Sequence, residues 1–422
     1  MKILSNASVY LGANIANAAI PFFLLPILTR VLSPAQYGMV AMFEAVVACL
    51  SVFTGLSIHG AVGVRYYDGE RDTFPQYVAV CLLILFGSTL ITAAVVSAAE
   101  SPLGRFTGLS NAWLFIAVLV SSAQFLVNIR LVIWQSGNQA LRYGIFQIAQ
   151  TALNASISLY LVLYLTWGSE GRMAGYALAT IIFGLIALLS MQTSGWMKWK
   201  WSREYFDDAM QFGLPLIPHT LGALAVAFSD RFIITESLGV DATGLYFAAV
   251  QLSMPLLMLG SSFNRAFVPW LFSKLANNEN ALAVTASYIA IFGLLLSGVF
   301  YSLFVHFALS LIVGEQYHQA KGLALILIIG TSFQAAYYAV VNYIFYAKRT
   351  GSLSVITLFT GAGYVLGAWI VVPSYGLQGV SMLFATIQCL TFILVWLVSS
   401  RVSPQPWVDF ALLRRTFRKT AE

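Results

Sequence analysis

Two ionisable side chains lie deep inside long apolar stretches of this sequence, where a charge is costly and therefore indicates function. Glu44 lies in the second apolar stretch, and His219 lies near the middle of the seventh, directly after Pro215 and Pro218. Prolines so close together break the helical hydrogen-bond ladder, and the freed carbonyl groups need water or a protein partner. We therefore predict Glu44 and His219 to be ion-coupling residues for H⁺ or Na⁺. Helix packing is the alternative role for both.

Cationic residues lie about one helical turn inside the predicted cytoplasmic ends of two spans. Arg130 is in the fourth apolar stretch and Arg265 is in the eighth. The two halves of the sequence resemble each other at an offset of 206 positions, and the residue that corresponds to Arg265 at this offset is His59. Both halves of the sequence thus place a potential cation at equivalent depth. Because arginine binds phosphate oxygens in a bidentate manner, the pattern predicts a pyrophosphate site. The alternative is that each arginine reaches the lipid headgroups.

Asparagines form a third set of candidates. Asn14 and Asn17 are about one turn apart on the first span and share a face. Together with Asn264 they are predicted to line a polar path suited to sugar hydroxyls, as are Asn6, Asn128, Asn154 and Asn342. Hydrogen bonding between helices is the alternative for each of them.

Motifs for catalysis and metal binding are absent from the sequence. It has no Walker motif, no nucleophile elbow, no HExxH and no Cys/His cluster, and its three cysteines lie singly in apolar runs. We predict no catalytic residues, no metal site and no cofactor, and hence a protein that is not an enzyme.

The composition of the chain indicates whether these residues lie in a membrane or in a soluble protein. Charged residues make up 9% of the 422 residues and hydrophobic residues 59%, where a soluble chain is about 25% charged. A soluble domain, a disordered chain and a nucleic-acid binder are excluded. Apolar stretches of about 20 residues predict an all-α polytopic membrane protein with spans near 7–29, 38–60, 76–97, 112–134, 144–166, 174–195, 209–233, 245–268, 284–308, 322–346, 352–372 and 379–400.

The distribution of basic residues predicts the orientation. Twelve spans that start with the N-terminus inside place 17 of the 22 Lys and Arg residues on the cytoplasmic side. Both termini are therefore predicted to be cytoplasmic. The predicted organisation is a lobe over 1–195, a cytoplasmic interfacial linker over 196–208, a second lobe over 209–400 and an amphipathic cytoplasmic tail over 401–422.

An internal repeat supports two lobes. Leu32-Ser-Pro-Ala-Gln-Tyr-Gly38 and Leu238-Gly-Val-Asp-Ala-Thr-Gly244 are 206 positions apart, and so are Ala179-Thr180-Ile181 and Ala385-Thr386-Ile387. Six spans in each repeat is an even number, so the lobes are predicted to be parallel, around a central cavity.

The same residues carry a resemblance to a known family. The stretch Pro26-Ile-Leu-Thr-Arg30-Val-Leu-Ser-Pro-Ala-Gln-Tyr37-Gly38 resembles the polysaccharide branch of the multidrug/oligosaccharidyl-lipid/polysaccharide exporter superfamily. Similar features in the second half are Leu214-Pro215, Asp230-Arg231 and Leu238-Gly239 with Gly244-Leu-Tyr246. Related lipid II flippases use arginines in the first, second and eighth spans, which implies binding roles for Arg30 and Arg265. The second span here has no arginine.

Members that the sequence resembles are Wzx-type flippases of the bacterial inner membrane. The resemblance implies alternating-access transport of an undecaprenyl-pyrophosphate-linked oligosaccharide, such as an O-antigen repeat unit, from the cytoplasmic to the periplasmic leaflet. Membrane lipids, a polysaccharide polymerase and a chain-length regulator are the implied partners, and nucleic acid is not one. Two alternatives remain, which are a cation-coupled multidrug exporter of the same superfamily and a membrane O-antigen polymerase or ligase.

Overall fold

A computed structural model of the chain describes residues 2–67, 72–347, 349–407 and 409. It describes only the backbone of residues 2–11, 13–15, 18, 219, 223 and 350. The described residues form helices joined by turns, with no strand among them, which confirms the predicted all-α class.

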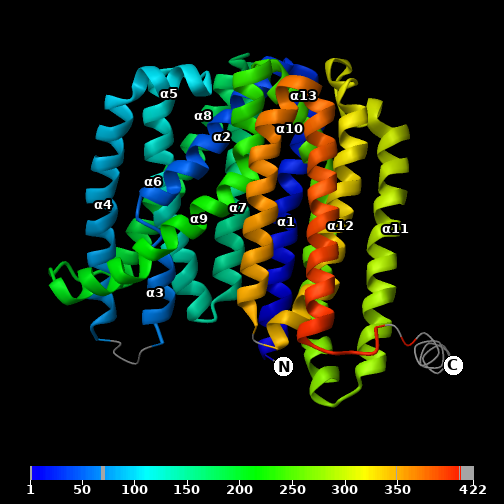
Figure 1. The fold of residues 1–422 in the computed structure, drawn as a ribbon. Helices are drawn as coiled ribbons and strands as arrows, with labels where there is room; N and C mark the ends of the chain where they lie inside the picture. The colour runs from blue at the N-terminus through cyan, green and yellow to red at the C-terminus, as the bar shows by residue number, and fades with distance from the viewer. Residues whose placement is uncertain (1, 68–71, 348, 408, 410–422) are drawn as a thin grey trace. The chain divides into compact units, whose positions relative to one another are not determined.

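The chain divides into two compact units, Met1–Gly244 and Leu245–Glu422. Helices that pack together in the first unit are often far apart in the chain, since α1 packs on α7 and α2 packs on α6 and α9, and α5 crosses one end of α4 and α6 (Figure 1). In chain order they are α1 (Lys2–Val31), α2 (Pro34–Phe53), α3 (His59–Arg65), α4 (Phe74–Ala98), α5 (Glu100–Thr107), α6 (Asn111–Ser136), α7 (Ala140–Leu159) with the π-helical turn η1 (Tyr160–Tyr164), α8 (Gly168–Thr193) and α9 (Arg203–Leu238).

The second unit begins at Leu245, within α10 (Val240–Ala276). It continues through α11 (Asn280–Ile312), the 3₁₀ turn η2 (Glu315–Tyr317), α12 (Ala320–Tyr346) and α13 (Thr350–Val402). Its core joins α10, α11, α12 and α13, and includes Trp407 from the segment after α13.

Most of these helices suit a lipid bilayer. Among the described residues, nine helices are long and apolar enough to cross a membrane, and the bent pair Arg203–Gly222 and Leu224–Leu238 makes a tenth if it is one span. α13 is two helices that meet at a kink where Gly376 has φ 61°, and the last two predicted spans fall on either side of it. On α4, Phe86, Leu90 and Ile91 form an exposed apolar stripe of the kind that faces lipid.

The second predicted span is shorter than the sequence indicated. α2 ends at Phe53, and Gly55, Leu56 and Ser57 all have positive φ before α3 begins. Gly55 is required here because a Cβ would overlap the ring of Phe125, and its N–H donates to Ser88 Oγ at 2.9 Å. Val52, Phe53, Leu56 and Ile58 keep this stretch hydrophobic on average, so hydropathy predicts one continuous span.

The domain boundaries predicted from the sequence remain a prediction. The contacts divide the chain at Gly244 because α9 packs on α2, α3, α4 and α5 of the first unit. Residues 408 and 410–422 of the predicted amphipathic tail lie outside the described residues. The part before them packs inward, since Trp407 lies among the rings of Tyr288, Tyr343 and Trp396.

Candidate functional site

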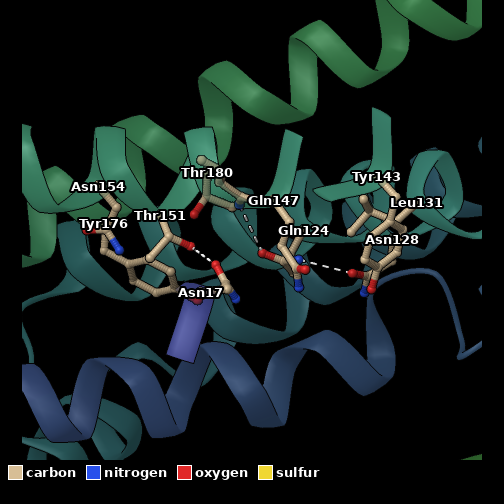
Figure 2. Close-up of a pocket in the computed structure, with 11 residues that line it drawn as sticks. Asn17, Gln124, Asn128, Leu131, Tyr143, Gln147, Thr151, Asn154, Tyr176 and Thr180 are labelled. Carbon is tan, nitrogen blue, oxygen red and sulfur yellow. Dashed lines mark hydrogen bonds between the residues drawn. The ribbon is translucent and has the colours of Figure 1, made fainter. Parts of the chain in front are cut away.

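The first unit contains a partly open polar pocket of about 300 Å³ between α1, α6, α7 and α8 (Figure 2). Among the described residues that line it, amides and hydroxyls predominate and none carries a charge. They are Asn17, Gln124, Asn128, Leu131, Tyr143, Gln147, Gln150, Thr151, Asn154, Tyr176 and Thr180.

Helical periodicity explains why these side chains converge. On α7, the polar residues Gln147, Gln150 or Thr151, and Asn154 recur every three to four positions, so they form one stripe along the helix. Gln124 and Asn128 are one turn apart on α6. α1 and α8 both pack against α7, which brings Asn17 from α1 to the same space (Figure 2).

The amides are linked to one another across the helices. Thr151 Oγ1 donates to Asn17 Oδ1, and Gln124 Nε2 donates to Asn128 Oδ1 at 3.0 Å. Gln150 Nε2 approaches Gln124 Oε1 at 3.5 Å. Such bonds orient each amide, because an amide oxygen accepts and its nitrogen donates.

A charged cluster adjoins one end of the pocket. The Arg172 guanidinium on α8 donates from Nη1 to Asn154 Oδ1 at 2.7 Å and to Ser158 Oγ at 3.1 Å. Its Nη2 lies 3.5 Å from Glu44 Oε1 on α2, and the two side chains are 9% and 30% exposed. Asn154 therefore belongs to both the pocket and the charged cluster.

The close approach of α7 and α8 at this cluster depends on a glycine. A Cβ on Gly175 would lie 2.6 Å from the backbone nitrogen of Ser158, which is closer than real Cβ atoms come. Gly175 is one turn from Arg172, so it lets the guanidinium reach across to α7. The glycine at position 175 therefore permits the close helix packing on which the hydrogen bonds of Arg172 to α7 depend.

A family model described as "Polysaccharide biosynthesis protein" matches residues 3–275. The chain belongs to the polysaccharide biosynthesis protein family. Two curated relatives from Haemophilus influenzae are similar over most of their length. "Lsg locus putative protein 1" is 23% identical over 86% of this chain and 90% of its own, and an "Uncharacterized membrane protein" is 26% identical over 87% and 90%.

Solved structures place this polysaccharide biosynthesis protein in a known fold. The lipid II flippase MurJ in an inward closed conformation matches with a TM-score of 0.70 and 12% identity, over 98% of this chain and 91% of that one. An inward-facing multidrug resistance MATE family transporter of the MOP superfamily matches with a TM-score of 0.67 and 18% identity, over 98% and 96%. The predicted all-helical polytopic membrane fold is confirmed, and at these identities the likeness concerns the fold alone.

The structure brings some of the predicted site residues of this family member together. Asn17 lines the pocket, and Glu44 is connected to it through Arg172 and Asn154. Asn128 and Asn154, two further members of the predicted polar path, also line it. The side chains of Asn14 and His219 lie outside what the structure describes, so their roles stay predictions.

Arg130 and His59 are in the first unit but are not among the residues that line the pocket. Arg130 is 2% exposed, its guanidinium lies over the Trp134 ring at 4.3 Å, and Nη2 donates to Ser194 Oγ at 3.2 Å. Its Nε and Nη1 have no hydrogen-bond partner among the described residues. His59 contacts the Phe125 ring edge-on.

The other predicted binding residues lie elsewhere. Arg30 lies in the last turn of α1, is exposed, and donates from Nη1 to the Pro26 carbonyl oxygen at 2.6 Å. Asn264 in the second unit accepts a 2.8 Å hydrogen bond from Asn342, as the helix-packing alternative describes. Arg265 is exposed on α10. Among the described residues, no group of three His, Cys, Asp or Glu side chains is placed to hold a metal ion.

The sequence reasoning missed Arg172 and most of the α7 stripe. Arg172 is one of the five basic residues that the predicted topology places on the non-cytoplasmic side, just before the span at 174–195, whereas α8 begins before it and buries it. The stripe was detectable, because Gln147, Gln150 and Asn154 recur with helical spacing inside an otherwise apolar stretch. A search for polar helical faces, in addition to charges, would have found it.

Proposed function

We propose that this protein flips an undecaprenyl-pyrophosphate-linked oligosaccharide, an O-antigen repeat unit or a similar glycan, from the cytoplasmic to the periplasmic leaflet. The observation that carries the proposal is the uncharged amide-lined pocket within membrane-spanning helices. Polar groups are costly to bury without partners, so such a pocket suits a ligand rich in polar, uncharged groups. Sugars have that chemistry, and the matched family is one of polysaccharide biosynthesis.

A flippase is needed for such a molecule because pyrophosphate and sugars cannot shed their water to cross the hydrocarbon core. We propose alternating access, in which the protein takes up the headgroup while the polyprenyl chain remains in lipid. The protein would lie in the bacterial inner membrane with both termini cytoplasmic, in line with the distribution of basic residues. A polysaccharide polymerase and a chain-length regulator are the partners that would use its product.

Arginines are the proposed ligands of the pyrophosphate. Arg130 supports the proposal because it is buried with two guanidinium nitrogens that have no hydrogen-bond partner among the described residues. Arg265 supports it because its side chain is exposed on α10 and is therefore open to an anion. Bidentate hydrogen bonds from either guanidinium would suit a phosphate oxygen pair.

Glu44 is the proposed ion-coupling residue, with His219 as the second. Protonation of Glu44 would weaken its ion pair with Arg172, and Arg172 also binds the pocket residue Asn154. A proton or cation at Glu44 could thereby change the pocket. This connection supports Glu44 in a coupling role.

A multidrug exporter is the second candidate, since a MATE family transporter shares the fold. An organic cation would favour a carboxylate in its pocket, whereas the lining residues here are uncharged and Glu44 is paired with Arg172. The pocket therefore favours the glycolipid substrate.

Reconstitution tests the proposal. The purified protein would be placed in liposomes that contain a fluorescent polyprenyl-pyrophosphate-linked oligosaccharide, and an impermeant reductant would quench the label in the outer leaflet. We expect the protein to raise the quenched fraction from about half to nearly all. If the labelled lipid does not cross while a cationic dye is exported in the same liposomes, the protein is a multidrug exporter and the proposal is wrong.

A further inference from the structure

The segment that joins α8 to α9, residues 196–202, turns two large aromatic side chains outward. α8 ends at Thr193 and α9 begins at Arg203, and the segment between them is not helical. Trp199 and Trp201 are 56% and 54% exposed. An indole is a large apolar body with one N–H donor, and it is favoured at interfaces where one side is apolar and the other is wet. Two exposed indoles so close together therefore indicate an interaction surface.

The backbone of this segment is held in place, so the exposed indoles project from a fixed support. The Lys198 N–H donates to the Pro75 carbonyl oxygen at the start of α4 at 3.0 Å. Trp196 turns inward and packs against the core of the first unit. Ser202 caps α9, since its Oγ accepts from the Tyr205 N–H. The segment is therefore a built part of the first unit.

Two lysines lie beside the exposed indoles. Lys198 and Lys200 are exposed, and neither has an ion-pair partner among the described residues. Arg203, the next basic residue, pairs with Asp207 at 2.9 Å. The segment contains no carboxylate of its own, and the exposed carboxylate that follows it is Glu204 in the first turn of α9. The segment thus presents positive charge next to two indoles.

The position of the segment points to a membrane. α4 and α8 are both long and apolar enough to cross a bilayer. The segment follows the end of α8, and its hydrogen bond to Pro75 places it at the start of α4. The start of α9 lies beside α3 and α4 in the first unit (Figure 1). Lipid headgroups begin where spanning helices end, and tryptophan is enriched at that level. A membrane lipid is therefore favoured over a soluble partner.

We infer that residues 196–202 form a docking surface for the headgroup of an anionic phospholipid, such as phosphatidylglycerol. Lys198 and Lys200 bind the headgroup phosphate, and Trp199 and Trp201 lie at the boundary between the headgroups and the acyl chains. A zwitterionic phospholipid offers the same phosphate together with an ammonium group that the lysines repel. The surface therefore selects an anionic lipid. This inference does not depend on which substrate the protein transports.

A lipid bound here also stabilises the start of α9. Tyr77 on α4 donates to Asp208 Oδ2 on α9 at 2.8 Å. The Arg65 guanidinium on α3 lies over the rings of Tyr77 and Tyr205, at 5.7 and 5.3 Å. The docking surface runs directly into this contact between three helices. Because a ligand that binds only the folded state raises its stability, phosphatidylglycerol should raise the thermal unfolding midpoint.

Native mass spectrometry of the full-length protein tests the selectivity. The protein in detergent would be titrated with phosphatidylglycerol and, separately, with phosphatidylcholine. We expect tighter binding of phosphatidylglycerol. The double variant Lys198→Gln/Lys200→Gln should weaken it by about fivefold per lysine, or about thirtyfold in all, and leave phosphatidylcholine nearly unchanged. Glu204→Gln removes the neighbouring carboxylate and should strengthen phosphatidylglycerol binding, a gain that misfolding cannot produce.

Fluorescence quenching in liposomes tests where the lipid binds. Phosphatidylglycerol or phosphatidylcholine with brominated acyl chains would quench nearby indoles. The difference between the wild type and Trp199→Phe/Trp201→Phe isolates the signal of these two tryptophans. We expect stronger quenching by brominated phosphatidylglycerol, and a smaller difference between the lipids as salt rises. Arg105→Gln, which removes an exposed cation in the last turn of α5, is the control and should leave this quenching unchanged.

Three results would overturn the docking surface. The first is equal affinity for the two lipids, and the second is unchanged phosphatidylglycerol binding in Lys198→Gln/Lys200→Gln. The third is no quenching of Trp199 and Trp201 by either brominated lipid, which would show that the segment faces water and suits a soluble acidic partner instead. Flipping of the labelled glycolipid is measured separately, so the proposed transport reaction can stand or fall without this surface.

Discussion

Gly38 and Gly244, which are 206 positions apart in the sequence, lie against each other in the first unit. A Cβ on Gly38 would lie 3.0 Å from the Gly244 nitrogen, and one on Gly244 would lie 2.8 Å from the Gly38 nitrogen. The Gly38 Cβ would also overlap the Val240 carbonyl oxygen, and the Gly244 Cβ would overlap that of Pro34. Val240 follows Pro34 by the same 206 positions, so the two contacts are reciprocal. A local two-fold relation produces such an exchange, which supports the repeat predicted from the sequence.

Gly38→Ala and Gly244→Ala should each lower the thermal unfolding midpoint of the solubilised protein. The added methyl group would overlap a backbone carbonyl oxygen that cannot rotate away, and overpacking of this kind costs about 1–3 kcal/mol. Thermal scans followed by size-exclusion chromatography would measure the change. Gly87→Ala on α4 is the control, because its Cβ would meet nothing within 4 Å, and it should be neutral or stabilising. Equal midpoints for all three variants would contradict the close contact.

Arg172 and Glu44 should show strong coupling in a double-mutant cycle. Arg172→Met leaves Glu44 without its partner and Asn154 Oδ1 without its shortest hydrogen bond, so we expect a loss of about 1–3 kcal/mol. The double variant Glu44→Gln/Arg172→Met should recover part of this loss because no lone carboxylate remains. Additive losses would show that the two side chains do not interact.

Arg265→Ala should abolish export of surface polysaccharide while the protein still inserts into the membrane. Arg265→Lys should restore export in part, because lysine keeps the charge and loses the bidentate geometry. Polysaccharide at the cell surface and the amount of protein in membranes would be measured together. Arg349→Ala, at an exposed position just before α13, is the matched control. Normal export by both Arg265 variants would assign that arginine to the lipid headgroups.

Reporter fusions should place residue 422 and the 98–111 region on opposite sides of the membrane. The expectation follows from the 17 of 22 basic residues that the predicted topology places in the cytoplasm. A phosphatase fusion would be active in the 98–111 region and inactive at residue 422. The same activity at both positions would refute the orientation.

Hydropathy was sufficient to predict the membrane-spanning helices from the sequence, because each span must be apolar on the side that faces lipid. It was not sufficient where an apolar stretch changes direction. Gly55, Leu56 and Ser57 interrupt the second predicted span through their backbone angles, and the apolar residues on either side keep the stretch hydrophobic on average. The close approach of Gly55 to Phe125, seventy positions away, arises only when α6 packs against α2.

The candidate site was predicted in part, for a related reason. Intramembrane charge identified Glu44, and amide composition identified Asn17 and Asn154, since each is conspicuous in an apolar stretch. Their connection through Arg172 could not be read from one sequence, because it requires that α2, α7 and α8 be neighbours. Arg172 itself lies next to a predicted loop, so the sequence reasoning treated it as a surface charge.

The ion pair between Glu44 and Arg172 also has a consequence for biogenesis. Arg172 is the 128th residue that the ribosome adds after Glu44, which takes roughly ten seconds at about 5–20 residues per second. During that interval α2 carries a carboxylate whose partner has not been made. Because an unpaired charge in the hydrocarbon core is costly, we expect the nascent α2 to remain beside the translocon or near the headgroups until α8 supplies Arg172.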